Sequence, residues 1–405
     1  MILRAAWVAP VVSPPIRDGF VRVEADRITA VGAARDLPPG ADTLDLGHCV
    51  LTPGLVNPHT HLELSCYAGR LPPGPFWEWL PGLVALRREP GQIERESAAA
   101  ARGAWESLRA GVTCVGDISR RNVAWRALRS IPIRKVCFVE LLSLADDPPR
   151  NAEELEAAAT EVIEDALLTV GVSPHTPYST TGAHFRGAID LARRLDRPWT
   201  THLAETPEEL AFLSGQEDAL PSPLRAAQRQ CGVVCPRQSP AEFLAQRAAG
   251  APPGALAHLN YLASEREMEP LAAGGHTVLY CPRAHHFFGH APHPWLRLLR
   301  RGVRVAIGTD SPASNWGVSM LDELRHLRAH VRGAPAADAL WRMATLDAAV
   351  ALRLADAIGS LEAGKQADLA AFPCGSHEST PLEALICEPR APSTVWTRGK
   401  TVIRF

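Results

Sequence analysis

The stretch LTPGLVNPHTHLE, residues 51–63, decides the predicted fold. Its apolar part from 51 to 57 is typical of a buried strand, and this strand runs into Asn57-Pro58-His59-Thr60-His61. Side chains two residues apart on a strand point to the same face, so we expect the imidazoles of His59 and His61 to reach one metal ion. The stretch therefore predicts a metal site at the carboxyl end of a strand.

The chain beyond this stretch alternates strand-like and helix-like segments. Apolar, strand-like runs recur at 112–118, 136–142, 167–172, 199–202, 256–259, 277–280 and 303–308. The Ala-, Leu- and Arg-rich stretches between them have helical spacing, as at 94–110, 151–166 and 240–249. Eight buried strands separated by helices predict an α/β fold, a (β/α)8 TIM barrel, in which functional residues follow the carboxyl ends of the strands.

The two ends of the chain resemble each other. Short β-like runs separated by Gly and Pro occur at 19–24, 28–31, 48–51, 367–372 and 394–402. We expect them to form one small β-sandwich from both termini. The predicted domains are residues 1–53 as the first part of the sandwich, 54–358 as the catalytic barrel and 359–405 as the second part of the sandwich.

Composition excludes several classes of partner. The 405 residues have a formal net charge of -2, which gives no basic surplus for a nucleic acid backbone or an anionic membrane. No apolar run approaches the roughly 18 residues of a membrane span. The nine cysteines are an odd number scattered along the chain, which fits reduced thiols and a cytoplasmic location. A homo-oligomer is compatible with the sequence.

Three more predicted strands end in chemically active side chains. The fifth ends in Thr201-His202-Leu203-Ala204-Glu205, the sixth in His258 and the eighth in Asp310. A lone histidine at a strand end is more often structural. Four strand ends that each deliver a histidine or an aspartate favour a common metal site instead.

The motifs LTPGLVNPHTHLE, THLAET (201–206), AHLN (257–260) and IGTDSPASN (307–315) resemble the amidohydrolase superfamily. The likeness is greatest to its mononuclear purine-type deaminases and chlorohydrolase-like members. It extends over nearly the whole chain and includes GSLEAGKQADLAAF, residues 359–372. The resemblance implies one divalent metal per chain, zinc in the first place and iron(II) as the alternative, with these ligands: His59, His61, His202 and Asp310.

The fourth predicted strand supports a single metal. Binuclear relatives usually carry a bridging carbamylated lysine at its end, whereas this strand ends in Gly171-Val172-Ser173-Pro174-His175. The lysines of the chain are Lys135, Lys365 and Lys400, all elsewhere.

The resemblance also implies roles in a deamination by metal-activated hydroxide. Asp310 would accept the proton of the attacking water, and His258 would hydrogen-bond the attacking oxygen. Glu205 would protonate the ring nitrogen next to the amine-bearing carbon before ammonia leaves. An acid three residues after His202 favours deamination over amide or phosphotriester hydrolysis.

The substrate is less closely defined. The stretches NPHTHLELS and GPFWEWL (74–80) resemble 6-aminodeoxyfutalosine deaminases of menaquinone biosynthesis. The candidate substrate-binding residues are His175 for a ribose, Trp79 for an aromatic ring, Arg283 for a carboxylate, and Glu63. We expect an aromatic amine or a nucleoside as the small-molecule substrate.

Other functions stay open at this point. Within enzymes they are deamination of adenosine, S-adenosylhomocysteine, guanine or a pterin, and a chlorohydrolase reaction. The alternative outside enzymes is a non-catalytic scaffold, although such relatives typically lose the metal ligands that this sequence keeps.

Overall fold

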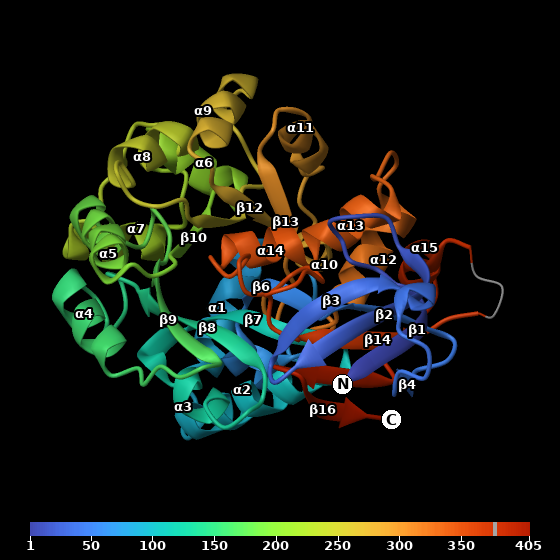
Figure 1. The fold of residues 1–405 in the computed structure, drawn as a ribbon. Helices are drawn as coiled ribbons and strands as arrows, with labels where there is room; N and C mark the ends of the chain where they lie inside the picture. Colours follow the sequence, from blue (N-terminus) through green and yellow to red (C-terminus); the bar gives the residue numbers. More distant parts are fainter. Residues whose placement is uncertain (376–378) are drawn as a thin grey trace.

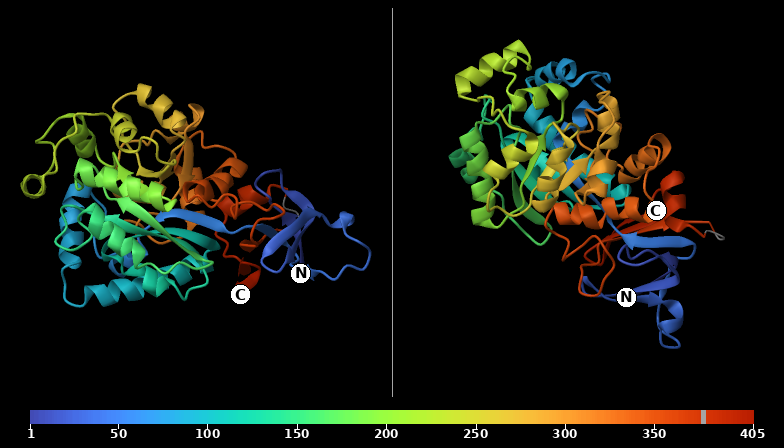
Figure 2. Two further views of the ribbon diagram at one scale, coloured as in Figure 1. Left: turned by 60° about the vertical axis from the view of Figure 1, so that its left-hand side comes forward. Right: turned by 90° about the horizontal axis from the view of Figure 1, so that it is seen from above.

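The computed structural model describes residues 1–375 and 379–405. Within these ranges the strands form two sheets of parallel strands in the middle of the chain and one sheet that combines strands from both termini (Figure 1). The terminal sheet stands at one side of the parallel-strand body, and the N- and C-termini both lie on that side (Figure 2).

The two parallel sheets each contain four strands. The first has the order β6 (Leu55–Thr60), β7 (Val112–Ser119), β8 (Arg134–Leu141) and β9 (Leu168–Pro174). The second has the order β10 (Thr200–Leu203), β11 (Ala255–His258), β12 (Thr277–Tyr280) and β13 (Arg304–Ile307). Parallel bridges connect the sheets at both edges, from Val172 to Trp199 and from Thr60 to Asp310. All eight carboxyl ends therefore face the same side.

Successive residues of these strands are buried on opposite faces. Leu55 packs into the large core beneath the helices, whereas Val56 joins an inner cluster with Cys114 and Phe138. Strands that are apolar on both faces read as continuous apolar runs, which is why the sequence shows them clearly. The alternation also explains how His59 and His61 come to the same site.

Most helices lie around the outside of these strands, whereas α14 (Leu346–Ala351) packs against their inner cluster (Figure 1). Several begin at capping side chains, because Asn151, Thr181 and Thr206 accept the backbone N–H three residues on. No helix in the described ranges is both long and apolar enough to cross a membrane. The α-helices are α1 (Phe76–Leu86), α2 (Gln92–Arg109), α3 (Ala124–Leu128), α4 (Ala152–Thr160), α5 (Gly182–Leu195), α6 (Pro207–Ser214), α7 (Ser222–Cys231), α8 (Pro240–Arg247), α9 (Met268–Ala273), α10 (Pro282–Phe287), α11 (Trp295–Arg300), α12 (Met320–His330), α13 (Ala337–Met343), α14 (Leu346–Ala351) and α15 (Pro381–Cys387); the 3-10 helices are η1 (Ala34–Asp36), η2 (Leu62–Tyr67), η3 (Arg120–Asn122) and η4 (Glu265–Glu267).

One predicted helix is shorter than its pattern suggested. The spacing predicted a helix over 151–166, but α4 ends at Thr160. The Asp165 carboxylate instead accepts the backbone N–H groups of Leu167 and Leu168, which holds a turn into β9.

The terminal sheet has the order β16-β15-β14-β5-β1-β2-β3, with β4 beside β1. The strand β1 was not predicted from the sequence. The strands from the N-terminal and C-terminal parts of the chain pack together through one apolar cluster that includes Leu3, Leu51 and Leu369. The strands are β1 (Ile2–Val8), β2 (Ile16–Glu24), β3 (Arg27–Ala33), β4 (Leu44–Asp45), β5 (Cys49–Pro53), β14 (Leu369–Pro373), β15 (Thr394–Thr397) and β16 (Lys400–Arg404).

The strand predicted over 51–57 is in fact two strands that belong to different sheets. β5 pairs with β1 and β14, whereas β6 pairs with β7. The change of sheet occurs at Gly54, where a Cβ atom would come within 2.0 Å of the Thr113 hydroxyl oxygen. Only glycine fits this close approach, so the residue marks the passage between the sheets.

Candidate metal centre and active site

The side chains predicted as metal ligands converge where β6, β10 and β13 end. The His61 Nε2 lies 3.2 Å from His202 Nε2 and 3.7 Å from Asp310 Oδ1. His59 Nε2 lies 3.4 Å from the same Asp310 oxygen. Four ligands placed tetrahedrally about 2.1 Å from a zinc ion would lie about 3.4 Å apart. The spacing of the donor atoms therefore fits one divalent metal.

His59 carries a second indication of a metal. Its side chain is fully buried, and neither Nδ1 nor Nε2 has a hydrogen-bond partner in the protein. A buried polar atom without a partner is costly, so native structures rarely leave one. A metal ion held by one of these nitrogens would remove that cost.

The backbone fixes Asp310 in place. Its N–H donates to the His59 carbonyl over 3.0 Å, and its φ of 58° lies in the left-handed region. The Ser314 hydroxyl donates to Asp310 Oδ2 over 3.1 Å, which leaves Oδ1 toward the histidines. Strain of this kind at a non-glycine residue is typical of functional sites.

The charge states suit a metal site. Burial lowers the pKa of His202 to about 3, with added repulsion from His59 and His175. Burial likewise lowers the pKa of His61 and of His258 well below its usual value. Burial acts to raise the pKa of Asp310, but the contact with His59 and the charges of His258 and His202 together outweigh it, and the pKa falls to about 2. Neutral imidazoles and an ionised carboxylate are the forms that bind metals.

Glu205 and His258 lie together next to this cluster. The distance from His258 Nε2 to Glu205 Oε1 is 3.7 Å, and both side chains are buried. Burial raises the pKa of Glu205 well above its usual value, and the charges of Asp310 and Glu209 add to this shift. A raised pKa favours the protonated carboxyl group, which is the form that a general acid needs.

A cavity opens above these residues, and one of its walls is apolar. The wall comes mainly from α1, with Phe288 beside it; the α1 side chains on the cavity are Phe76, Trp79, Leu80, Leu83 and Val84. The Trp79 and Phe288 rings meet edge to face at 5.1 Å between centroids. The indole N–H of Trp77 donates to Thr206 and Glu208, which ties α1 to the segment that follows Glu205.

His175 lines the same cavity. Its Nδ1 lies 2.7 Å from the Ser179 hydroxyl, and its Nε2 lies 4.0 Å from Glu140 Oε1. The Glu140 oxygen is buried without a hydrogen-bond partner and faces the cavity. Glu140 was missed in the sequence, although its position one residue before the end of β8 was a usable signal.

Two arginines also reach the cavity, and neither was predicted as a site residue. Arg87 follows α1, and Arg120 follows β7. They lie close enough to His175 to contribute, after burial, to the lowering of its pKa to about 3. The cavity therefore has a metal-ligand end with imidazoles and one carboxylate, and a region lined by the guanidinium groups of Arg87 and Arg120, which we call the cationic region.

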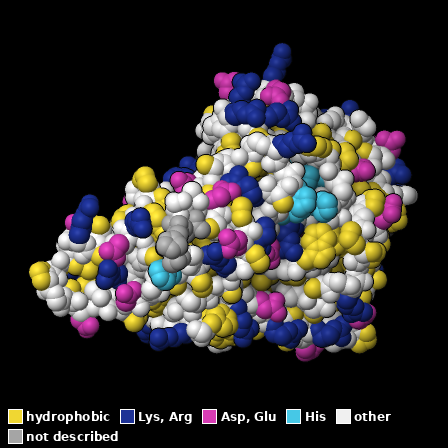
Figure 3. Space-filling view, turned by 90° about the vertical axis from the view of Figure 1, so that its right-hand side faces the viewer, with side chains coloured by type: hydrophobic (Ala, Val, Ile, Leu, Met, Phe, Trp, Pro, Cys, Tyr) yellow, Lys and Arg dark blue, Asp and Glu magenta, His cyan; other side chains and the backbone are white. Residues whose placement is uncertain are grey.

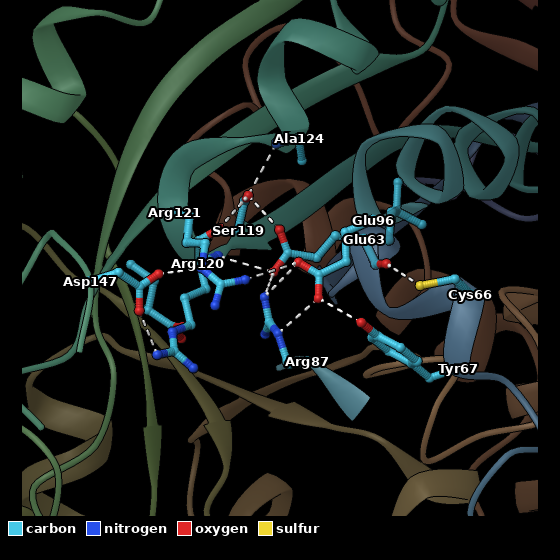
Figure 4. Close-up of polar contacts among 12 residues, drawn as sticks. Glu63, Cys66, Tyr67, Arg87, Glu96, Ser119, Arg120, Arg121, Ala124 and Asp147 are labelled. Carbon is cyan, nitrogen blue, oxygen red and sulfur yellow. Dashed lines mark hydrogen bonds and ion pairs between the residues drawn. The ribbon is translucent and has the colours of Figure 1, made fainter. Parts of the chain in front are cut away.

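Glu63 lies behind this cationic region (Figure 4). It is fully buried and accepts hydrogen bonds from Arg87 over 2.7 Å and from the Ser119 hydroxyl over 2.6 Å. Glu96 holds the other side of Arg87 at 3.0 Å. Glu63 is not among the described residues that line the cavity, so the structure places it as a support for Arg87.

Arg120 is held less completely. Its Nη2 donates to Asp147 over 2.7 Å, and Arg121 pairs with the same carboxylate (Figure 4). The Arg120 Nε is buried and has no hydrogen-bond partner. One Asp147 carboxylate thus serves two guanidinium groups, which leaves Arg120 with donor capacity for a further anion.

Arg283 lies away from this cavity. Its guanidinium is 3.8 Å from carboxylate oxygens of Asp322 and Glu323 and stacks near Trp316. Lys135 also points elsewhere, because its Nζ donates to the carbonyls of Leu128 and Ile131.

Comparisons with known proteins agree with this architecture. A model of the amidohydrolase family matches residues 50–402. The chain is 29% identical over 381 residues to a 5-methylthioadenosine/S-adenosylhomocysteine deaminase of Nitratidesulfovibrio vulgaris. The aligned region covers 91% of this chain and 81% of that protein.

Solved structures give the same picture. An adenosine deaminase from Xanthomonas campestris with bound zinc has a TM-score of 0.84 and 27% identity, over 100% of this chain and 92% of that one. A Helicobacter pylori aminofutalosine deaminase in complex with methylthio-coformycin has a TM-score of 0.87 over 99% of this chain and 100% of that one. At 23% identity this second likeness concerns the fold alone.

Proposed function

The chain belongs to the amidohydrolase family, and from this premise we propose that it deaminates an aminopurine nucleoside that carries an anionic substituent, 6-aminodeoxyfutalosine being our first candidate. The chain is a hydrolase of carbon–nitrogen bonds, and its relatives are deaminases. The observation that carries the substrate proposal is the pair Arg87 and Arg120 on the wall of the cavity that holds the metal-ligand cluster.

We assign the metal to His59, His61, His202 and Asp310. Three imidazoles and one carboxylate suit Zn²⁺, with Fe²⁺ as the alternative. A metal bound there supplies Lewis acidity, which lowers the pKa of a water molecule toward neutrality.

The protein side chains carry the protons of the reaction. Asp310 accepts a proton from the attacking water, and His258 hydrogen-bonds the oxygen that adds to the amine-bearing ring carbon. Glu205 gives its proton to the adjacent ring nitrogen. Asp310 then returns its proton to the amine, and the carbon–nitrogen bond breaks with loss of ammonia. The proton left on the added oxygen passes to the Glu205 carboxylate, so the ring keeps a carbonyl oxygen and both acids return to their starting states.

The rest of the cavity has groups for the parts of a nucleoside. The unpartnered Glu140 oxygen and His175 are suited to ribose hydroxyls, which donate and accept hydrogen bonds. Trp79 and Phe288 offer apolar faces to a ring system. Arg120, with Arg87 beside it, is suited to a carboxylate. We therefore place the carboxylate contact, first expected at Arg283, at Arg120 and Arg87.

A second candidate satisfies the same observation. S-Adenosylhomocysteine also carries a carboxylate, and the Nitratidesulfovibrio vulgaris relative is named for it. Adenosine, guanine, a pterin and a chlorinated triazine offer no carboxylate to the arginines, so we rank them lower. A non-catalytic scaffold would not need the converging donors of the metal site.

The finer architecture is also a proposal. We infer that the two bridged parallel sheets form a closed (β/α)8 barrel over residues 54–358, and that residues 1–53 and 359–405 form a β-sandwich. The bridges at both sheet edges and the shared apolar cluster of the termini support this. We also propose a cytoplasmic location. That the chain forms a homo-oligomer stays a prediction.

The experiment is ammonia release from the zinc-loaded protein with 6-aminodeoxyfutalosine, S-adenosylhomocysteine, 5-methylthioadenosine, adenosine, guanine and a pterin. We expect kcat/KM to be highest for a substrate with a carboxylate. A preference for 5-methylthioadenosine or adenosine would contradict the anionic substituent and leave deamination standing. No ammonia from any of them, with one metal bound per chain, would contradict the substrate class.

A further inference from the structure

A second cleft lies outside the cavity described above and shares no lining residue with it. Its walls are formed mainly by α10, the segment after α10, and α12. Six histidines line this cleft: His285, His286, His290, His293, His326 and His330. The proposed reaction uses none of them.

The sequence brings three of these histidines to one place. His326 and His330 are four residues apart on α12, so they lie on the same helix face. His286 comes from α10, which packs against α12. On the face drawn in Figure 3, histidine side chains gather at the surface next to hydrophobic ones.

The rings of these three residues lie close together, although their nitrogens do not all come within 4.8 Å of one another in the present side-chain positions. The ring centroids lie 5.2 Å apart for His286 and His326, 4.3 Å for His326 and His330, and 6.1 Å for His286 and His330. Among the proposed catalytic ligands the corresponding distances are 5.0 to 5.3 Å. His286 and His330 are exposed, so their side chains can turn to close the longest separation.

The hydrogen bonds leave nitrogens available in the cleft. His330 Nδ1 lies 3.0 Å from the His326 carbonyl, a contact that leaves its Nε2 uncommitted. Burial lowers the pKa of His326 to about 4, with added repulsion from His330 and His286, so this imidazole is neutral at pH 7. Deeper in the cleft, the Nε2 atoms of His285 and His290 are buried without a hydrogen-bond partner. Imidazole nitrogens with no protein partner are the groups that bind transition metals.

We propose that His286, His326 and His330 form a second binding site for a divalent transition metal, selective for Zn²⁺, Ni²⁺ or Cu²⁺ over Mg²⁺ and Ca²⁺. The all-imidazole donor set gives this selectivity, because Mg²⁺ and Ca²⁺ require oxygen ligands. The site binds more weakly than the catalytic one, because it is exposed and has no carboxylate among its three ligands.

The test is equilibrium dialysis of the full-length, untagged protein against Zn²⁺, with the bound metal counted per chain. We expect two equivalents for the wild type. The double variant His326→Gln/His330→Gln should keep the first equivalent and lose the second, or bind it at least about tenfold more weakly. The control variant His48→Gln changes an exposed histidine of the terminal sheet region and should keep both equivalents.

A single equivalent in the wild type, or a second equivalent that survives in the double variant, would overturn the site. If the double variant failed to fold, the single variant His330→Gln on the exposed end of α12 would give the same comparison. The proposed substrate fails separately, since a protein that binds two zinc ions and releases no ammonia contradicts only the reaction. Retention of the untagged wild type, but not the double variant, on immobilised Ni²⁺ is an independent measurement.

Discussion

The metal-ligand end of the cavity and its cationic region are built in different ways. The proposed metal ligands stand at or next to the carboxyl ends of three strands, where paired backbones set their positions. Arg87 stands at the end of a helix and Arg120 at the start of a 3-10 turn, and carboxylates hold them instead: buried Glu63 and Glu96 hold Arg87, and half-buried Asp147 holds Arg120 (Figure 4). In the function proposed above, the chemical step thus depends on residues set by the sheet, and substrate choice depends on side chains held by ion pairs in the loops.

This difference predicts how the two regions respond to amino-acid substitution. A site fixed by strand ends tolerates little substitution, because each ligand is needed for the same ion. Arg87 is costly to replace, because its loss would leave the buried carboxylates of Glu63 and Glu96 unpaired. Arg120 is the better residue to change, because Asp147 would keep its ion pair with Arg121. The predictions below separate the two regions by what each variant loses.

The largest expected effect is that of Asp310→Ala. It removes a proposed ligand and the proposed base together, so metal content should fall below stoichiometry and kcat/KM by about four orders of magnitude or more. Metal analysis measures the metal content, and ammonia release measures kcat/KM. The control Asp190→Ala changes an exposed carboxylate on α5 and should behave as wild type. Full activity in Asp310→Ala would overturn the ligand assignment.

Glu205→Gln should separate metal binding from turnover. The amide cannot donate the proton of a carboxylic acid, so we expect kcat to fall by about 10²- to 10⁴-fold while the metal stays bound. The matched control is Glu217→Gln, which alters an exposed ion pair with Arg237. Near-normal turnover would remove Glu205 from its role as the acid.

Arg120→Met tests the cationic region. Loss of a charged donor to a carboxylate should raise KM for 6-aminodeoxyfutalosine or S-adenosylhomocysteine by about 10- to 100-fold. KM for adenosine and the bound metal should change little. The control Arg126→Met removes an exposed arginine of α3. An equal loss for neutral and carboxylate-bearing substrates would show that Arg120 does not select by charge.

The smallest effect is expected for Glu323→Gln, which loosens the support behind Asp310. Glu323 is buried and accepts a hydrogen bond from Asn315, which also donates to the Thr309 carbonyl. We expect Tm to fall by about 2–5 °C at pH 5, with metal and activity retained.

The pH dependence of this effect has a defined sign. Burial raises the pKa of Glu323 from 4.5 to about 8, so the folded protein binds a proton there that the unfolded chain releases. This contribution to stability is present below the unfolded pKa and is lost as pH rises toward about 8. The variant lacks it, so the difference in Tm should shrink between pH 5 and pH 8. A difference that widens with pH would contradict the buried, protonated carboxyl.

Much of the proposed metal site was predictable because it follows strand periodicity. His59 and His61 are two residues apart, and His202, His258 and Asp310 each follow an apolar run that the sequence shows plainly. The substrate region was harder to predict. Arg87 is one of several arginines around the end of α1, and nothing in its local sequence shows that its guanidinium turns inward between Glu63 and Glu96.

The sequence by itself determined the order of strands and helices, the family, and the set of side chains at the strand ends, because periodicity and motif spacing are local properties of the chain. Only the tertiary structure decided that Gly54 passes the chain between two sheets, that Glu63 supports an arginine, and that Arg120 rather than Arg283 lines the cavity. These outcomes depend on contacts between segments tens to hundreds of residues apart. Burial and the available ionic partners, rather than local sequence, determine where a long charged side chain points.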